Sequence, residues 1–157
     1  RPGKIILGSL GDIEAGVRQL SRKRPLECRE ATLPSGRTLR VPTAAETLRI
    51  KGFLCVKRNQ VRDYLDVAAL ADRYGIDNAA TVLARIDDYY ADEQRGDEAV
   101  ATQLARQLAA PPPADSTRTS ELGTYKGLAA RWHDWKSVTR VLGHLAAAML
   151  EQPPREE

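Results

Sequence analysis

Cysteine, histidine and long hydrophobic runs are scarce in this 157-residue chain. The cysteines are Cys28 and Cys55 and the histidines are His133 and His144, and their spacing is not that of a zinc site. No disulfide scaffold is indicated, and we expect no structural metal. No apolar stretch approaches the roughly 20 residues that cross a bilayer, and no signal peptide is recognisable. We therefore expect a cytoplasmic protein with no membrane partner, cut from something longer because no initiator Met is present.

Aromatic residues make up 5% of the chain, charged residues 29% and hydrophobic residues 42%, which is the mixture of an ordinary soluble protein. Its length is close to what one hydrophobic core can serve, so a single domain is the first expectation. The net charge of +3 permits an anionic partner such as a nucleotide or RNA without requiring one. Composition thus argues against a disordered chain and leaves the function open.

Strands and turns dominate the expectation for the first part of the chain. Residues 4–7 predict a strand, which a glycine turn connects to a helix over residues 12–20. Residues 25–42 alternate weakly around the turn residues 34–36, which predicts a β-hairpin. The glycine turn over residues 8–11 is either a phosphate cradle or a structural strand-to-helix turn. Because it is neither a P-loop nor G-x-G-x-x-G, we favour the structural turn.

After residue 42 the pattern becomes helical. Thr43 with Glu46 three residues later fits a capping box, in which the hydroxyl and the carboxylate each satisfy an end amide. The helix that it opens runs to about Asn59. A second helix follows through Tyr74 and stops at Gly75.

Three more helices are expected towards the C-terminus. Asp77 caps the third helix, Asp97 caps a fourth that ends at the prolines 111–113, and the last helix starts near Asp134. Residues 111–120 are polar and proline-rich, which is typical of a loop or linker. The apolar face of the last helix comprises Val138, Val141, Leu142, Leu145 and Met149.

Together these elements predict an α+β chain, with short β-strands and a hairpin at the N-terminus followed by a mainly helical bundle. The chain is either a single domain or the C-terminal portion of a longer protein. The expected regions are strands and a hairpin over 1–42, helices over 43–110, a linker over 111–120 and C-terminal helices over 121–152.

Trp132, His133 and Trp135 lie in a basic stretch that admits two interpretations. Aromatic and basic residues are interleaved on nucleic-acid-binding surfaces. Alternatively, the tryptophans dock the start of the last helix onto the bundle. We favour docking, because aromatic residues are scarce here and most are needed in the core. His144 falls away from the apolar face and should be solvated.

Lys51 is a more specific signal, because it lies in an apolar helical run three residues after Leu48 and four before Cys55. Burying an unpaired ammonium costs several kcal/mol, of order 2 or more. Asp63 and Asp66 share a face of the next helix, and two helices joined by a short turn pack antiparallel. Lys51 and an acid could therefore form a buried salt bridge that clamps the helix hairpin, or they could be catalytic. The residues alone leave both accounts open.

The segment VPTAAETLRIKGFLCVKRNQVRDYLDVAALADRYG resembles part of the AbiEii/AbiGii-type toxin nucleotidyltransferases, which include the mycobacterial MenT-type toxins. In that family a lysine-bearing helix precedes an Arg-Asp-x-x-Asp helix. The resemblance implies that Lys51 contacts the triphosphate of a nucleotide and that Asp66 completes the catalytic site. Asp63 would support the catalytic residues, and the remaining implied nucleotide-binding residues are Arg62, Lys57 and Arg58.

The chain departs from that family in one respect. Related nucleotidyltransferases carry an Asp-x-Asp pair that holds Mg²⁺ on the phosphates, and this chain contains no Asp-x-Asp. Gly8-Ser9 followed by Asp12 and Glu14 does not replace it, because the acids follow too soon. Mg²⁺ and a nucleoside triphosphate are thus expected in the complete enzyme, and neither is expected to be held by this chain alone.

Two functional hypotheses follow. In the first, the chain is the C-terminal part of a toxin nucleotidyltransferase, with a cognate antitoxin and an RNA acceptor, tRNA by the family resemblance, as partners. In the second, it is a noncatalytic helical interaction domain in which Lys51 and Asp66 form a structural ion pair. Asp66 should lie nearer the packed seam than Asp63, because Leu65 and Val67 flank it and an apolar residue follows four positions on. We therefore expect Asp66 to contribute more to function than Asp63.

Overall fold

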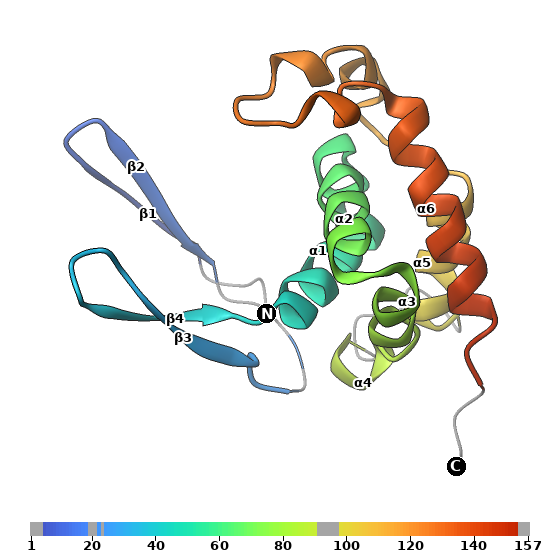
Figure 1. The fold of residues 1–157 in the computed structure, drawn as a ribbon, viewed down its shortest axis with the longest axis horizontal. Helices are drawn as coiled ribbons and strands as arrows, with labels where there is room; N and C mark the ends of the chain where they lie inside the picture. Colours follow the sequence, from blue (N-terminus) through green and yellow to red (C-terminus); the bar gives the residue numbers. More distant parts are fainter. Residues whose placement is uncertain (1–4, 19–21, 23, 91–97, 154–157) are drawn as a thin grey trace.

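Two antiparallel β-hairpins precede a bundle of helices in the computed structural model, which describes residues 5–18, 22, 24–90 and 98–153. The hairpins lie side by side and project away from the bundle, and the last helix runs along the opposite side (Figure 1). The predicted α+β class is therefore confirmed, with strands at the N-terminus and helices after them. The division of the chain into four regions stays a prediction.

The first hairpin consists of β1 (Ile5–Leu10) and β2 (Ile13–Arg18), paired from Ile5 with Arg18 to Leu10 with Ile13. The prediction of a helix over residues 12–20 is wrong for residues 13–18, and residues 19–20 lie outside the described part. Gly11 adopts a φ of 59°, which lets the chain reverse in a two-residue turn, and pairing then satisfies the strand amides. The glycine segment 8–11 accordingly leads into a strand and not into a helix.

The second hairpin, β3 (Cys28–Thr32) with β4 (Thr38–Pro42), confirms the hairpin predicted for residues 25–42. Its connection contains Gly36 at a φ of 78°, a left-handed conformation that glycine adopts without a steric penalty. The Gly36 N–H donates to the Leu33 carbonyl at 2.9 Å, and the Leu33 N–H donates to the Arg37 carbonyl at 2.8 Å. The turn residues therefore close the hairpin as the sequence indicates.

Helices α1 (Ala44–Arg58) and α2 (Val61–Tyr74) have the predicted boundaries. The Thr43 hydroxyl accepts a hydrogen bond from the Glu46 N–H at 3.1 Å, so half of the capping box is present. The other predicted hydrogen bond, from the Thr43 N–H to the Glu46 carboxylate, is not formed. The Thr43 N–H donates to the Glu27 carbonyl at 2.9 Å, because the second hairpin runs past the start of α1, and the Glu46 carboxylate turns to two arginines instead.

The next helices are α3 (Ile76–Ala84), α4 (Asp87–Tyr90) and α5 (Val100–Ala109). The prediction that Asp77 caps the third helix is wrong, since Gly75 ends α2 and caps α3 at once and Asp77 falls in its first turn. Asp97, the predicted cap of the fourth, lies outside the described residues. Asp87 performs this role from a distance, accepting hydrogen bonds from Val100 N–H at 2.7 Å and Ala101 N–H at 3.2 Å.

Three short 3₁₀ turns, η2 (Ser116–Ser120), η3 (Leu122–Thr124) and η4 (Ala130–Trp132), lead to α6 (Trp135–Leu150). The last helix starts next to Asp134 as predicted, and Asp134 caps it by accepting a hydrogen bond from the Lys136 N–H at 3.1 Å. Trp132 is buried, and Trp135 contacts Tyr64 edge-on with ring centroids 6.4 Å apart, which confirms that the tryptophans dock this region onto the bundle. His144 is exposed, as expected.

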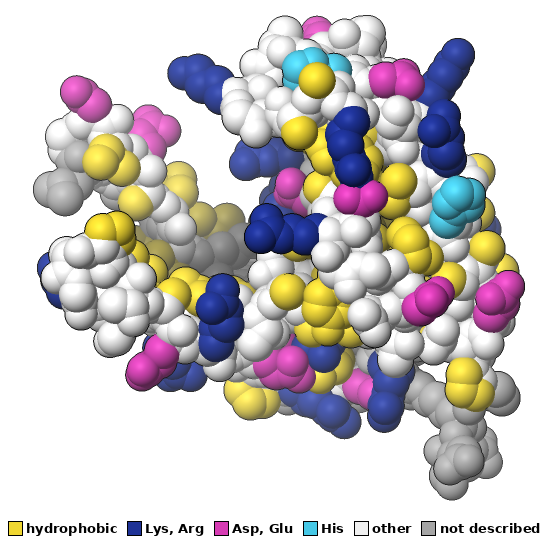
Figure 2. All heavy atoms as spheres, in the orientation of Figure 1, with side chains coloured by type: hydrophobic (Ala, Val, Ile, Leu, Met, Phe, Trp, Pro, Cys, Tyr) yellow, Lys and Arg dark blue, Asp and Glu magenta, His cyan; other side chains and the backbone are white. Residues whose placement is uncertain are grey.

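The hydrophobic core lies among α1, α2, α3, α5 and α6. Side chains of α3 and α5 lie close against α1 at Gly52, since a Cβ there would lie 2.8 Å from Leu83 Cδ2 and 3.0 Å from Leu104 Cδ2. The hairpins lie outside this core, and hydrophobic side chains appear on their surface (Figure 2). Within the described ranges, every helix is too short or too polar to traverse a bilayer.

Candidate functional site: a charged seam and a basic pocket

The seam between α1 and α2 brings Lys51 and the two predicted acids together. The Lys51 Nζ lies 2.6 Å from Asp66 Oδ2 and 3.7 Å from Asp63 Oδ1. About a quarter of the Lys51 side chain is exposed, so its stem lies against apolar neighbours and its ammonium is paired. The sequence prediction that Lys51 faces an acid across the helix hairpin is therefore confirmed, and the structure adds that both acids lie near its ammonium.

Asp63 is the buried acid of this group. Its side chain is 0% exposed, whereas that of Asp66 is 36% exposed, so the expectation that Asp66 lies nearer the seam is wrong. The reason is that Asp63 lies in the first turn of α2, beneath the C-terminal end of α1, where the Arg58 Nε approaches Asp63 Oδ2 to 3.3 Å. Neither carboxylate oxygen of Asp63 has a hydrogen-bond partner, although both are near cations.

Burial raises the pKa of Asp63, against the opposing effect of the Arg58 and Lys51 charges. The thiol of Cys55, fully buried in α1 beside this group, has a raised pKa for the same reason, increased further by the charges of Asp63 and Asp66. Such a thiol is protonated and unreactive at neutral pH. The seam is thus an ion-pair cluster with one poorly solvated acid, and Cys55 supplies it with no nucleophile.

The turn between α1 and α2 is attached to the chain that follows α5. Asn59 adopts the left-handed conformation, with φ 54° and ψ 49°, and its side-chain amide donates to the Pro112 carbonyl at 2.6 Å. Its Oδ1 accepts from the Tyr64 hydroxyl at 2.6 Å, and its backbone carbonyl accepts from the Ala114 N–H at 2.7 Å. These bonds place the segment after Ala114 beside the start of α2.

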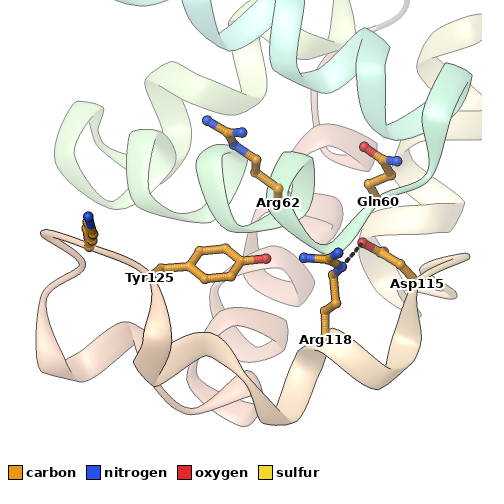
Figure 3. Close-up of a pocket in the computed structure, with 6 residues that line it drawn as sticks. Gln60, Arg62, Asp115, Arg118 and Tyr125 are labelled. Atoms are coloured by element: carbon orange, nitrogen blue, oxygen red, sulfur yellow. Dashed lines mark ion pairs between the residues drawn. The ribbon is translucent and has the colours of Figure 1, made fainter. Parts of the chain in front are cut away.

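A pocket of about 650 Å³ opens at this junction (Figure 3). Its lining comes from α2 and its cap, from η2 and the residue before it, and from the loop after η3. Lining residues are Gln60, Arg62, Asp115, Arg118, Tyr125 and Lys126. Three of them are cationic and one is acidic, so the pocket carries an excess of positive charge.

The acid in the pocket already has partners. Asp115 Oδ1 accepts a hydrogen bond from the Val61 N–H at 2.8 Å, which caps α2 from outside the helix, and Asp115 Oδ2 lies 3.8 Å from the Arg118 Nε. Gln60 connects the pocket to the charged seam, because its Oε1 accepts a hydrogen bond from Arg58 Nη2 at 3.2 Å. The seam and the pocket are neighbours at the two ends of one short turn.

The structure does not bring the four predicted nucleotide-binding residues together. Lys51 and Arg58 lie at the seam, whereas Arg62 lines the pocket, and Lys57 lies exposed on the last turn of α1. The sequence offered no signal for Arg118 or Tyr125, since they come within reach of Arg62 only through the bonds around Asn59.

A second buried cluster joins the hairpins to the bundle and was also missed. The Glu46 carboxylate, 0% exposed, pairs with Arg22 and lies 3.2 Å from Arg49 Nη1. Arg49 Nη1 also lies 2.9 Å from Glu27 Oε2, and the other carboxylate oxygen, Glu27 Oε1, accepts a hydrogen bond from the Tyr89 hydroxyl at 2.7 Å. The hydrogen bonds from Arg49 and Tyr89 lower the pKa of Glu27. Structural ion pairing accounts for the whole cluster.

Residues 5–18, 22, 24–90 and 98–153 contain no group of three or more His, Cys, Asp or Glu side chains that could bind a metal ion. What the site offers chemically is charge: an ion-paired seam with one buried acid, and a pocket with excess cations.

Comparison with known proteins found relatives among mycobacterial transport proteins. The chain is 41% identical over 131 residues to the heme uptake protein MmpL11 of Mycobacterium tuberculosis, covering 83% of this chain and 13% of that protein. It is 38% identical over 133 residues to the mycolic acid-containing lipids exporter MmpL11 of Mycolicibacterium smegmatis, covering 85% and 13%. The probable transport protein MmpL11 of Mycobacterium leprae is 35% identical over 137 residues, covering 83% and 12%. No family model and no solved structure matches.

These relatives overturn the resemblance to AbiEii/AbiGii-type toxins, and with it the prediction of a toxin nucleotidyltransferase with antitoxin and tRNA partners. They give no support to the alternative of a noncatalytic interaction domain either. The resemblance failed because a lysine ahead of Arg-Asp-x-x-Asp is a short pattern that an ion-paired helix hairpin also produces, as Lys51 on Asp66 shows. The expectation of Mg²⁺ and a nucleoside triphosphate concerned that enzyme and is not tested by these relatives.

The chain spans only 12 to 13% of the length of the relatives it matches. It is therefore similar to one segment of the mycobacterial transport proteins named MmpL11.

Proposed function

We propose that this chain is an extramembrane domain serving an MmpL11-like membrane transport protein. The observation that carries the proposal is the identity of 35 to 41% over most of this chain to one segment of three such proteins. An identity of this size over more than 130 residues reflects a shared fold. The domain would then do for its transport protein what the matched segment does for the relatives.

The fold supports a role outside the lipid phase. None of the described helices is long and apolar enough for a bilayer, and the core lies within the bundle itself. The movement of cargo across the membrane would accordingly be the task of other parts of the transport protein. Names given to the relatives include heme uptake and export of mycolic acid-containing lipids, and a cargo of either kind would be the one affected by this domain.

A cytoplasmic position is the second part of the proposal. Cys28 and Cys55 are both free thiols, and unpaired cysteines are typical of proteins kept in a reducing compartment. The net positive charge fits the cytoplasmic leaflet, whose anionic lipids attract basic segments.

An exchange of segments tests the transport role. In the M. smegmatis MmpL11 the matched segment of 133 residues is replaced by this chain, and export of mycolic acid-containing lipids is measured in cells lacking the original protein. We expect the chimera to restore export, with a flexible linker of equal length as the control that does not. A chimera that is present in the membrane at normal level and exports no more than the linker control would contradict the proposal.

Thiol labelling tests the position. Cys28 is partly accessible and Cys55 is buried, so a membrane-impermeant maleimide should report on Cys28 alone. In cells producing the transport protein, we expect labelling only after the cells are opened, and Cys28→Ser removes the signal. Labelling of Cys28 in intact cells would place the domain on the outside.

A further inference from the structure

We propose that the pocket lined by Arg62, Arg118, Lys126 and Tyr125 binds a phosphate group. The three cationic side chains come from three separate segments and line one cavity of about 650 Å³. A cavity of this size holds a phosphate with part of the molecule that carries it. The three charges, two of which have no partner within the described residues, point to an anion as the ligand.

Arg62 and Lys126 make no hydrogen bond or ion pair with the described part of the chain. The other charged clusters of the protein behave differently, since Lys51, Arg49 and Arg58 each lie on a carboxylate. Two cations without a partner that share a cavity repel one another, and an anion between them removes that repulsion. The guanidinium group of Arg62 also offers the fork of donors that matches phosphate oxygens.

The acid in the pocket does not oppose an anion strongly. Both Asp115 oxygens are occupied, one by the Val61 N–H and one by Arg118. The positive end of the α2 dipole faces the same cavity, because Gln60, the N-cap residue of α2, lines it. Once Asp115 and Arg118 are set against each other, Arg62 and Lys126 still leave the pocket with a net positive charge.

Tyr125 gives the pocket a second kind of recognition. Its side chain and that of Arg118 point toward one another across the cavity (Figure 3). A phenolic hydroxyl donates to a phosphate oxygen, and its ring covers an apolar part of the ligand. The chemistry recognised is therefore a phosphate ester with an organic substituent, either an anionic phospholipid headgroup or a soluble phosphate compound. The lipid source rests on the proposed function, because it requires a nearby membrane.

The test titrates the full chain with inorganic phosphate and follows the side-chain N–H signals of Arg62 and Arg118 by NMR. We expect saturable shifts of these two signals. Arg62→Gln with Lys126→Gln should weaken binding about tenfold or more, since two charge-assisted contacts are lost. Because neither residue has a partner, the variant should stay folded. Lys136→Gln with Arg140→Gln, two exposed cations on α6, is the control with the same loss of charge and should bind as the parent does.

Vesicles identify the source of the phosphate. Phosphatidylcholine vesicles containing phosphatidylglycerol are compared with pure phosphatidylcholine vesicles, for the chain and for both double variants. If the chain binds vesicles only when they contain phosphatidylglycerol and only when the pocket residues are intact, the ligand is a lipid headgroup. If the chain binds inorganic phosphate but not these vesicles, the ligand is a soluble phosphate compound. The proposed phosphate site would be refuted if phosphate binding were weakened equally in both double variants, or if the Arg62 and Arg118 signals showed no saturable shift. If the segment exchange fails while phosphate binding is intact, the proposed transport function is refuted and the phosphate site is not.

Discussion

The helical bundle and the two hairpins use apolar residues in opposite ways. In the bundle most large apolar residues are buried, as Ile86 and Leu104 are at 0% exposure, whereas Ile13 and Leu7 of the first hairpin are 69% and 80% exposed. One face of that hairpin, which holds Ile6, Gly8, Ile13, Ala15 and Val17 by strand alternation, carries no polar side chain. The difference teaches that the bundle stabilises itself, while the hairpins depend on specific attachments.

The attachment through Glu46 should produce the largest effect when it is broken. Glu46→Gln removes the charge that pairs with Arg22, whose side chain is only 4% exposed, so a nearly buried guanidinium loses its carboxylate partner. We expect a loss of roughly 3 to 5 kcal/mol in the free energy of unfolding, measured with urea.

Glu98→Gln is the matched control, because the pair of Glu98 with Arg106 is exposed. It should change stability by no more than about 1 kcal/mol. Equal effects of the two substitutions would show that the buried cluster does not join hairpin to bundle as described.

Close packing within the bundle gives the next effect. Gly52→Ala places a Cβ 2.8 Å from Leu83 Cδ2, so we expect a loss of about 1 to 3 kcal/mol although alanine favours helices. Gly143→Ala in α6 meets nothing within 4 Å and should stabilise by about 0.5 to 1 kcal/mol. Urea unfolding of both variants measures the contrast, and a gain at both positions would refute the close approach at Gly52.

A smaller effect, dependent on pH, is expected at the seam. The pKa of Asp63 is raised in the folded state by burial, so the folded protein binds this proton more tightly than the unfolded chain. The contribution of Asp63 to stability is therefore most favourable below its unfolded pKa and declines as pH rises through its folded pKa.

Asp63→Asn removes this titration while keeping the shape. We expect the melting temperature of the variant minus that of the parent to rise as the pH increases from 4 to 7. Thermal unfolding of both proteins at each pH measures this difference. Asp66→Asn, whose side chain is partly exposed, is the comparison. A difference that falls with pH would mean that the cations around Asp63 outweigh its burial.

The smallest effect should come from the hairpin face. Ile13→Val removes one methylene from a side chain that is 69% exposed, and we expect a change within about 0.5 kcal/mol. Ile86→Val makes the same chemical change in the core and should cost about 0.5 to 1.5 kcal/mol. If Ile13→Val cost as much as Ile86→Val, the hairpin face would be buried in solution, and size measurement would then show whether copies of the chain associate.

Local signals in the sequence were sufficient for most of the helices. The boundaries of α1 and α2 followed from Thr43, Asn59 and Gly75, because caps and helix stops act on neighbours in the chain. The first hairpin was missed because residues 12–20 also fit a helical pattern, and only pairing with β1 decides between them. The family resemblance failed for a comparable reason, since one short pattern fits two structures.

The sequence by itself determined the α+β class, the second hairpin and the meeting of Lys51 with an acid across a helix hairpin. Each of these depends on residues a few positions apart, whose periodicity and turns are readable along the chain. Only the tertiary structure decided that Asp63 is buried and that Arg62 and Arg118, 56 positions apart in the numbering, line one pocket. Burial and long-range charge pairing depend on how whole elements pack, and no local pattern specifies them.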